Sequence, residues 1–316
     1  MGIFRRKSKR PKRDAADLPR DSALALLSET EAAFLRSRVR EAFAEQGLEV
    51  TMGPAHVTDS TGRRFGLANL AATCHHDRRG TRAWPLLVRD HVDKILRSVD
   101  GPDVLTTMPR ERLLARLFPR IVGIDMAHLD GGYAYGPELT PDLLEVLALD
   151  LPETVQVLNE RGLATLGEPA PLRVRALANL RRIPVKRHRT VTEDDGARFH
   201  VLEGESYFLP SLVLLLDEVA PVYEEAELGP EGALVAMPFR HQFAFHVITG
   251  RSVVPTLNAM ARFAATGFAQ APGAVSPSVY WWRAGTLTRL TAPEGRAIRV
   301  DVDLDFQQLL ERLTDN

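Results

Sequence analysis

The sequence predicts an α+β fold with mixed, mainly antiparallel sheets and packed helices, and leaves two similar halves as an open alternative. Helical and strand patterns follow one another without a strict strand–helix–strand rhythm, which disfavours a doubly wound sheet. A clear helix start lies near Ser28, whereas residues 233–237 and 243–248 are short apolar runs of the kind found in a buried strand pair. The 316 residues suffice for one large or two medium domains.

The first helix is indicated by its cap and by its apolar spacing. Ser28 and Glu31 match a capping box, and Gly47 can terminate the helix that follows. The positions expected on its buried face are Ala32, Leu35, Val39, Ala42 and Phe43. After this helix we expect short strands at 48–52 and 64–67 around a turn at 59–62, helices at 67–74, 86–99 and 110–117, and a strand at 121–126.

The middle of the chain contains one ambiguous segment. Residues 133–139 and 143–149 can pair as antiparallel strands, but Thr140-Pro141-Asp142 is also a good helix start. The alternation around Val146 favours the strand. A strand at 154–158, a helix capped by Asn159 and ending at Gly167, and a helix at 171–182 are expected next.

The last third contains the remaining expected elements. They are strands at 199–202, 233–237, 243–248, 279–282 and 297–302, and helices at 212–219, 254–268 and 304–313. The tetrapeptide Leu-Ala-Asn-Leu occurs at 67–70 and again at 177–180, which duplication or chance would explain. The domains predicted are a disordered basic arm at 1–20, an N-terminal α+β region at 21–130 and a C-terminal α+β region at 131–316.

Positive charge is concentrated at the N-terminus. Residues 1–20 carry a net charge of +6, whereas the whole chain has a net charge of −1. We expect these basic residues to bind an anionic surface, either a membrane or a nucleic acid. The residues predicted to make this contact are Arg5, Arg6, Lys7, Lys9, Arg10, Lys12 and Arg13.

The composition favours a cytoplasmic protein. A single cysteine, Cys74, excludes an internal disulfide framework and suits a reducing compartment. No apolar segment follows the basic residues, so a secretory signal is not expected. The strongest apolar run, 207–216, is too short to span a bilayer and contains Pro210. Peripheral attachment at the inner membrane face remains open.

Several short stretches of the chain carry a resemblance to a known family. They are Leu-Asp-Leu-Pro-Glu at 149–153, Val-Gln-Val-Leu at 155–158, Gly-Leu-Ala-Thr-Leu-Gly at 162–167, Ala-Leu-Ala-Asn-Leu-Arg at 176–181, Leu-Val-Ala-Met-Pro-Phe-Arg at 234–240, Gly-Leu-Ala-Asn-Leu at 66–70 and Leu-Leu-Val at 86–88. With these stretches the chain resembles the YtpQ-like family of uncharacterised bacterial proteins, a domain of unknown function. The resemblance extends over most of residues 45–290. It implies a cytoplasmic α+β protein and no particular reaction.

The most reactive side chains of the chain do not form a recognisable catalytic pattern. Cys74, His75, His76 and Asp77 are all possible metal ligands, but consecutive residues on a helix point in different directions. We therefore predict a solvated helix end and no metal site. His241 and His246 lie five positions apart, and on a regular strand they would face opposite sides.

Two other groups of residues have an ordinary explanation. A basic cluster is interpreted as a solvated loop paired with the acidic residues Glu193, Asp194 and Asp195, although phosphate binding is the alternative. Its members are Arg181, Arg182, Lys186, Arg187, His188 and Arg189. Tyr280, Trp281 and Trp282 alternate on an expected strand, so core packing is favoured over a stacking platform.

No nucleotide-binding glycine loop, Gly-x-Ser-x-Gly elbow or His-Glu-x-x-His motif is present. The sequence therefore predicts a non-catalytic binding or adaptor module that has a protein partner and needs no cofactor. The alternative is an enzyme of unrecognised type, such as a hydrolase, that uses Cys74 with histidines 75, 76, 241 and 246.

Overall fold

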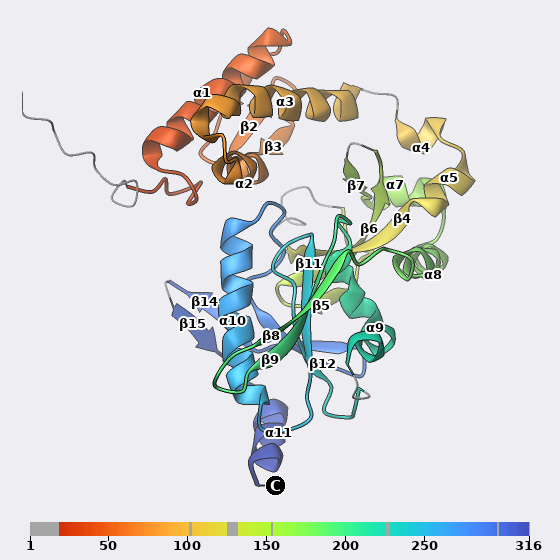
Figure 1. Cartoon of the computed structure of the whole chain (residues 1–316). Coiled ribbons are helices and arrows are strands. Elements are labelled where there is room, and N and C mark those ends of the chain that lie inside the picture. Colours follow the sequence, from red (N-terminus) through yellow and green to blue (C-terminus); the bar gives the residue numbers. More distant parts are fainter. Residues whose placement is uncertain are drawn as a thin grey trace, which may run out of the picture. The chain divides into compact units, whose positions relative to one another are not determined.

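The computed structural model describes residues 19–100, 103–124, 132–152, 154–224, 228–295 and 297–315, except the side chains at 98–100 and 314–315. It has the expected mixed α+β fold with mainly antiparallel sheets (Figure 1). The chain divides into two compact units, Met1–Asp93 and Lys94–Asn316. Helix α3 (Trp84–Asp100) spans this division. The basic arm predicted at 1–20 falls almost entirely outside the described residues.

The first unit packs helices α1 (Glu29–Glu45) and α2 (Ala68–His76) with a small antiparallel sheet. Its strands are β1 (Val50–Met52), β2 (His56–Asp59) and β3 (Arg64–Gly66), and a 3-10 turn η2 (Gly80–Ala83) precedes α3. The capping box is confirmed, because the Ser28 hydroxyl accepts from the Glu31 amide and the Glu31 carboxylate accepts from the Ser28 amide at 2.8 Å. The predicted apolar face of α1 is buried.

The second unit contains a smaller sheet with strand order β4-β6-β5, and β7 pairs with β6. The strands are β4 (Leu117–Gly123), β5 (Glu138–Thr140), β6 (Leu143–Asp150) and β7 (Val155–Val157). Residues 140–142 form the turn between β5 and β6, so the strand interpretation of 143–149 is confirmed. The predicted boundary between the N-terminal and C-terminal regions lies after position 130. Because β4 pairs with β6 along its whole length, strand pairing joins residues on the two sides of that position.

Helices surround this sheet. They are α4 (Val104–Thr107), α5 (Arg110–Ala115), α7 (Glu160–Leu166) and α8 (Pro169–Leu180). The Asn159 side chain caps α7 by accepting from the Gly162 amide at 2.9 Å, as predicted. The repeated Leu-Ala-Asn-Leu lies at the start of α2 but at the end of α8, so its two copies do not occupy equivalent places.

A six-stranded antiparallel sheet forms the centre of the second unit, in the order β13-β12-β10-β11-β9-β8. Its strands are β8 (Arg187–Thr192), β9 (Arg198–Glu203), β10 (Ala233–Ala236), β11 (Gln242–Val247), β12 (Val279–Arg283) and β13 (Thr286–Arg289). The segment 187–189, expected in a loop, is part of edge strand β8. A hairpin of β14 (Thr291–Glu294) and β15 (Ala297–Val300) follows.

Both faces of the six-stranded sheet are covered (Figure 1). The 3-10 helix η3 (Leu209–Leu215) and α9 (Leu216–Tyr223) pack on the face that includes Phe243 and Phe245. Helices α10 (Val253–Gln270) and α11 (Leu304–Asp315) pack on the face that includes Val201 and Leu234.

A buried polar network connects the two sheets of the second unit. The Tyr280 hydroxyl, fully buried on β12, donates to the Asp142 carboxylate at 2.7 Å in the β5–β6 turn. Ser276 hydrogen-bonds the same hydroxyl at 2.6 Å, and Thr140 donates to Asp142 at 2.7 Å. Since buried polar groups are costly when unpaired, this network fixes how the smaller sheet meets β12.

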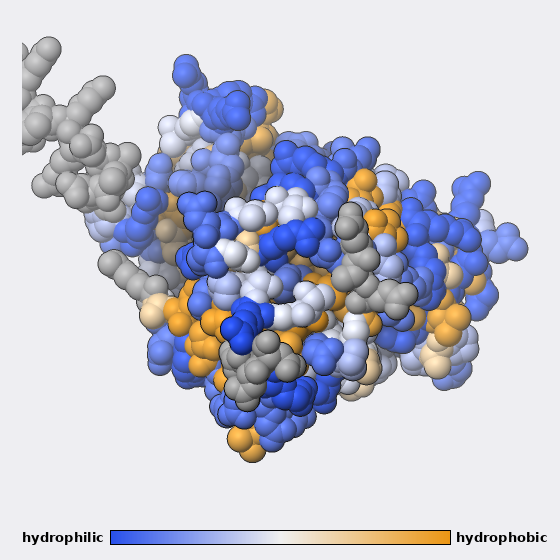
Figure 2. Space-filling view, turned by 60° about the horizontal axis from the view of Figure 1, so that its bottom comes forward, coloured by the Kyte–Doolittle hydropathy of each residue, from blue (hydrophilic) through white to orange (hydrophobic). Residues whose placement is uncertain are grey.

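The surface is largely hydrophilic on the face that Figure 2 shows, with apolar residues in small groups. The large apolar side chains that are exposed are spread along the sequence: Leu86, Val174, Val222, Val254, Phe268, Val300 and Leu304. Within the described stretches no helix is both long and apolar enough to cross a membrane.

Candidate functional site: an arginine cluster

The seven basic residues predicted to bind an anionic surface, at positions 5–13, lie outside the described residues. Their role stays a prediction.

Cys74 is packed in the interior of the first unit. Its side chain is buried on α2, and burial raises the pKa of its thiol to about 12. The thiolate is the nucleophilic form, so this cysteine is protonated and inert at neutral pH. His75 and His76 contact each other edge to face, and Asp77 pairs with Arg79 at 2.7 Å. Over the described part of the chain, no three His, Cys, Asp or Glu side chains converge to hold a metal ion.

His241 and His246 do not act together. His246 lies on β11 opposite Leu234, on the sheet face that packs against α10. Burial lowers its pKa to about 4, so the imidazole is neutral, and its buried Nε2 has no partner among the described residues. His241 lies in the turn before β11 and contacts Arg240 instead. With Cys74 in the other unit, the proposed Cys74–histidine site is not assembled within either unit.

The basic cluster at 181–189 is mostly paired within the second unit. Arg181 forms a two-bond ion pair with Glu218 at 2.6 and 2.8 Å. Arg187 and Arg189 both pair with Glu203 on β9. The acidic partners are therefore not Glu193, Asp194 and Asp195, as the sequence had suggested. These pairs are exposed and contribute little stability, but they engage Arg181, Arg187 and Arg189 with carboxylates.

The aromatic run on β12 belongs to the core. Tyr280, Trp281 and Trp282 are 0%, 3% and 8% exposed, because β12 lies between β10 and β13 with both faces covered. They offer no stacking surface.

A histidine pair that sequence reasoning did not identify lies at the edge of the six-stranded sheet. Nε2 of His188 on β8 is hydrogen-bonded to Nδ1 of buried His200 on β9 at 2.9 Å. Nε2 of His200 is 2.7 Å from the Glu224 carboxylate, which also pairs with Arg198 at 3.2 Å. This chain leads from the exposed imidazole of His188 to the half-buried carboxylate of Glu224.

Two arginines of the second unit are positioned differently from all those above. Arg120 projects from β4 and is half-buried beside Arg240, Tyr207 and Tyr133. Desolvation and, secondarily, repulsion from Arg240 lower the pKa of Arg120 to about 10. No carboxylate of residues 103–124, 132–152, 154–224 or 228–295 pairs with it. We call Arg120, Arg240, Tyr133, Tyr207 and His241 the arginine cluster.

Arg240 is held in place on three sides. Its Nε donates to Nε2 of His241 at 3.0 Å, and Nδ1 of His241 is 3.1 Å from the Gly204 carbonyl. The guanidinium carbon lies 4.0 Å from the centre of the Tyr207 ring, within the range of a cation–π contact. Burial lowers the pKa of His241, so the ring stays neutral and accepts from Arg240.

Gly273 makes room for this arrangement. It has a φ of +78°, and a Cβ there would lie 2.4 Å from Cδ of Arg240. Only glycine combines this left-handed backbone with so close an approach. The Gly273 carbonyl also accepts from the Arg240 amide at 2.9 Å. The local backbone is thus built around the Arg240 side chain.

The cluster therefore combines positive charge with N–H donors that have no acceptor among the described residues. Both Nη groups of Arg240 and the guanidinium of Arg120 lack an acceptor in the described parts of the second unit, while the Nε of Arg240 is committed to His241. Guanidinium groups bind carboxylate and phosphate oxygens in a bidentate manner. This arrangement is suited to binding an anion.

Sequence reasoning missed this cluster, although two signals were present. Arg120 interrupts the apolar run of β4, and Arg240-His241 lies between two buried strands. A charged residue in a buried strand requires a partner or a function. The sequence cannot show that β4 and the β10–β11 turn meet.

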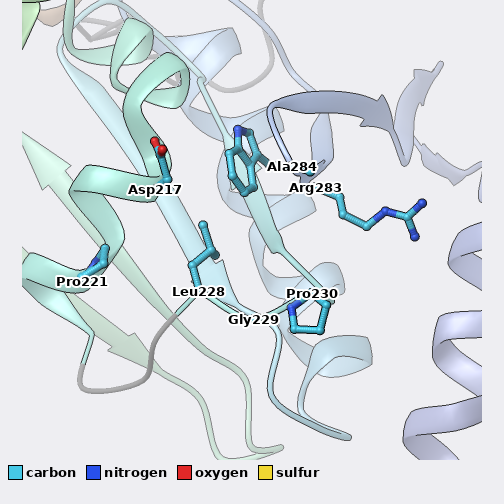
Figure 3. Close-up of a pocket in the computed structure, with 8 residues that line it drawn as sticks. Asp217, Pro221, Leu228, Gly229, Pro230, Arg283 and Ala284 are labelled. Carbon is cyan, nitrogen blue, oxygen red and sulfur yellow. The ribbon is translucent and has the colours of Figure 1, made fainter.

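Two pockets elsewhere in the second unit lack such features. One of about 500 Å³ lies between α9, residues 228–230 and the β12–β13 hairpin, where Arg283 points away from the other lining residues (Figure 3). Arg283 instead contacts the Trp281 ring at 4.5 Å. A second pocket of about 210 Å³ is mostly apolar, and its Glu145 and Arg173 are paired with each other at 2.6 Å.

Comparisons with protein-family models, with curated proteins and with solved structures gave no match. The resemblance to the YtpQ-like family accordingly stays a prediction.

Proposed function

We propose that the chain is a non-catalytic binding protein that recognises an anionic group of its partner through the arginine cluster. The observation that carries this proposal is the pair of half-buried guanidinium groups, Arg120 and Arg240, without a carboxylate partner in the described residues. A desolvated cation without a counter-charge is unfavourable, so such a pair is typical of a site that its ligand completes.

The chemistry of the cluster favours binding over catalysis. Both ring nitrogens of His241 are engaged, one by Arg240 and one by the Gly204 carbonyl, so the imidazole is not available as a general base. The alternative of an enzyme based on Cys74 loses support, because a protonated buried thiol is a poor nucleophile.

The N-terminal arm adds a second anionic contact to this proposal. Its seven basic residues would hold the protein near an anionic membrane or a nucleic acid, while the arginine cluster would recognise the partner. Polybasic attraction amounts to roughly 1 kcal/mol per charge near an anionic leaflet, so salt would reverse it. A protein partner, a cytoplasmic location and peripheral attachment belong to the same proposal.

The proposal is tested with three variants of the full chain: Arg120→Gln, Arg240→Gln and Arg182→Gln. Arg182 is an exposed arginine of the same unit and serves as the matched control. Isothermal titration with sodium sulfate measures anion binding at constant ionic strength. We expect the first two variants to lose at least tenfold in affinity, and Arg182→Gln to bind like the wild type. Equal affinities in all four proteins would show that the cluster is not the binding site.

A further inference from the structure

The arginine cluster has more N–H donors without an acceptor among the described residues than a carboxylate can use. Neither the guanidinium of Arg120 nor the two Nη groups of Arg240 has an acceptor in the described parts of the second unit, and Tyr207 lies near both arginines. A carboxylate has two oxygens, whereas a phosphoryl group has three terminal oxygens that can each accept from a different group. The donor set therefore matches a phosphoryl group better.

The charge of the cluster leads to the same conclusion. Arg120 and Arg240 are both cations, whereas burial and the charge of the neighbouring Arg240 lower the pKa of His241 and favour its neutral form. A monoanion would leave one half-buried guanidinium uncompensated, whereas a dianion neutralises both. The Tyr207 ring covers one face of the Arg240 guanidinium, so the ligand meets its Nη edge, which is the edge used in bidentate pairs.

We propose that the arginine cluster binds the dianionic form of a phosphate group, either a phosphomonoester or free phosphate. This inference rests on the proposed function and specifies its ligand. The phosphomonoester and free phosphate share the dianionic phosphoryl group. They differ in that the phosphomonoester carries an ester substituent, which would need space beside Tyr207 and Tyr133.

The test uses the pH dependence of binding to the full-length protein. The second ionisation of a phosphomonoester has a pKa of about 6, so the dianion falls about tenfold between pH 7 and pH 5. Phosphoserine, inorganic phosphate and sulfate are titrated at both pH values. Sulfate remains a dianion throughout and reports any change in the protein itself.

That sulfate control is needed because other groups face the cluster. Tyr207 and Tyr133 lie beside Arg120, and Glu205 interacts with His241. Protonation of His241 at low pH would add positive charge and would affect all three anions alike.

The expected result is a several-fold to tenfold loss of phosphoserine affinity at pH 5 relative to that of sulfate. The loss should be larger for inorganic phosphate, whose second ionisation occurs at higher pH, and both losses should be absent in Arg120→Gln and Arg240→Gln. Tighter binding of phosphoserine identifies a phosphorylated partner, and tighter binding of inorganic phosphate identifies the free ion. If sulfate binds but phosphate affinity does not follow the ionisation, or if acetate binds equally well, the dianion inference is wrong and the proposed function stands. If no anion binds, both are wrong.

Discussion

Replacing Arg120 by methionine is expected to stabilise the protein in the absence of ligand. The pKa of Arg120 is lowered to about 10, chiefly by desolvation and next by repulsion from Arg240. A lowered pKa of a cation means that its charge opposes folding wherever the group is protonated. The penalty is therefore fully present below pH 10 and disappears only as pH rises into the ordinary range of an arginine.

The size of this effect follows from the same pKa. Each tenfold change in proton affinity corresponds to about 1.4 kcal/mol, so the charge of Arg120 costs the folded chain about 3 kcal/mol at neutral pH. Methionine keeps an apolar stem of similar length and removes the charge. Allowing for imperfect packing, we expect Arg120→Met to raise the free energy of unfolding by about 1–3 kcal/mol.

Arg173 provides the matched control, because it is an arginine of the same unit with a carboxylate partner. It pairs in a bidentate manner with Glu145 at 2.6 and 2.9 Å, and the Glu145 side chain is only 2% exposed. Arg173→Met leaves that carboxylate buried without a counter-charge. Because Arg173 itself is 43% exposed, we expect a loss of about 2 kcal/mol, below the range for a fully buried pair.

The assay is urea unfolding at pH 7 of the wild type and both variants, followed by fluorescence with and without phosphate. The two substitutions should shift the midpoint in opposite directions, and phosphate should stabilise the wild type but not Arg120→Met. A midpoint for Arg120→Met at or below that of the wild type would refute the argument, since it would mean that the guanidinium is already compensated.

Three further predictions concern other parts of the molecule. Gly273→Ala should lower the free energy of unfolding by about 1–3 kcal/mol through its positive φ, and it should weaken sulfate binding at least threefold because the new Cβ displaces Arg240. The control is Gly285→Ala, at a positive φ with open space around it, which should cause only the loss of stability. Equal sulfate affinity in both variants would contradict this role of Gly273. Cys74 should resist alkylation at pH 8 in the folded protein and react on unfolding, as its raised thiol pKa and burial require; rapid labelling of the native state would contradict its assignment to the core. Deletion of residues 1–20 should abolish salt-sensitive binding to anionic vesicles or DNA while leaving sulfate affinity unchanged, and vesicle and DNA binding that survive the deletion would disprove the role of the arm.

The sequence determined the elements whose residues carry a local periodicity or a cap. The Ser28–Glu31 capping box and the apolar face of α1 were predictable because their contacts lie within one helical turn or two. The strand at β6 and the cap at Asn159 were predictable for the same local reason. Together these elements determined the α+β class.

Edge strand β8 was not predictable, because a solvated strand shows no apolar alternation and its basic residues look like a loop. The arginine cluster was likewise invisible, because it joins β4 to the β10–β11 turn, which are far apart in the sequence. Whether an arginine is paired, as Arg173 is with Glu145, or has no carboxylate partner among the described residues, as for Arg120, depends on which strands and helices become neighbours. Local residue patterns do not contain that information, since charge compensation is a property of packing in three dimensions.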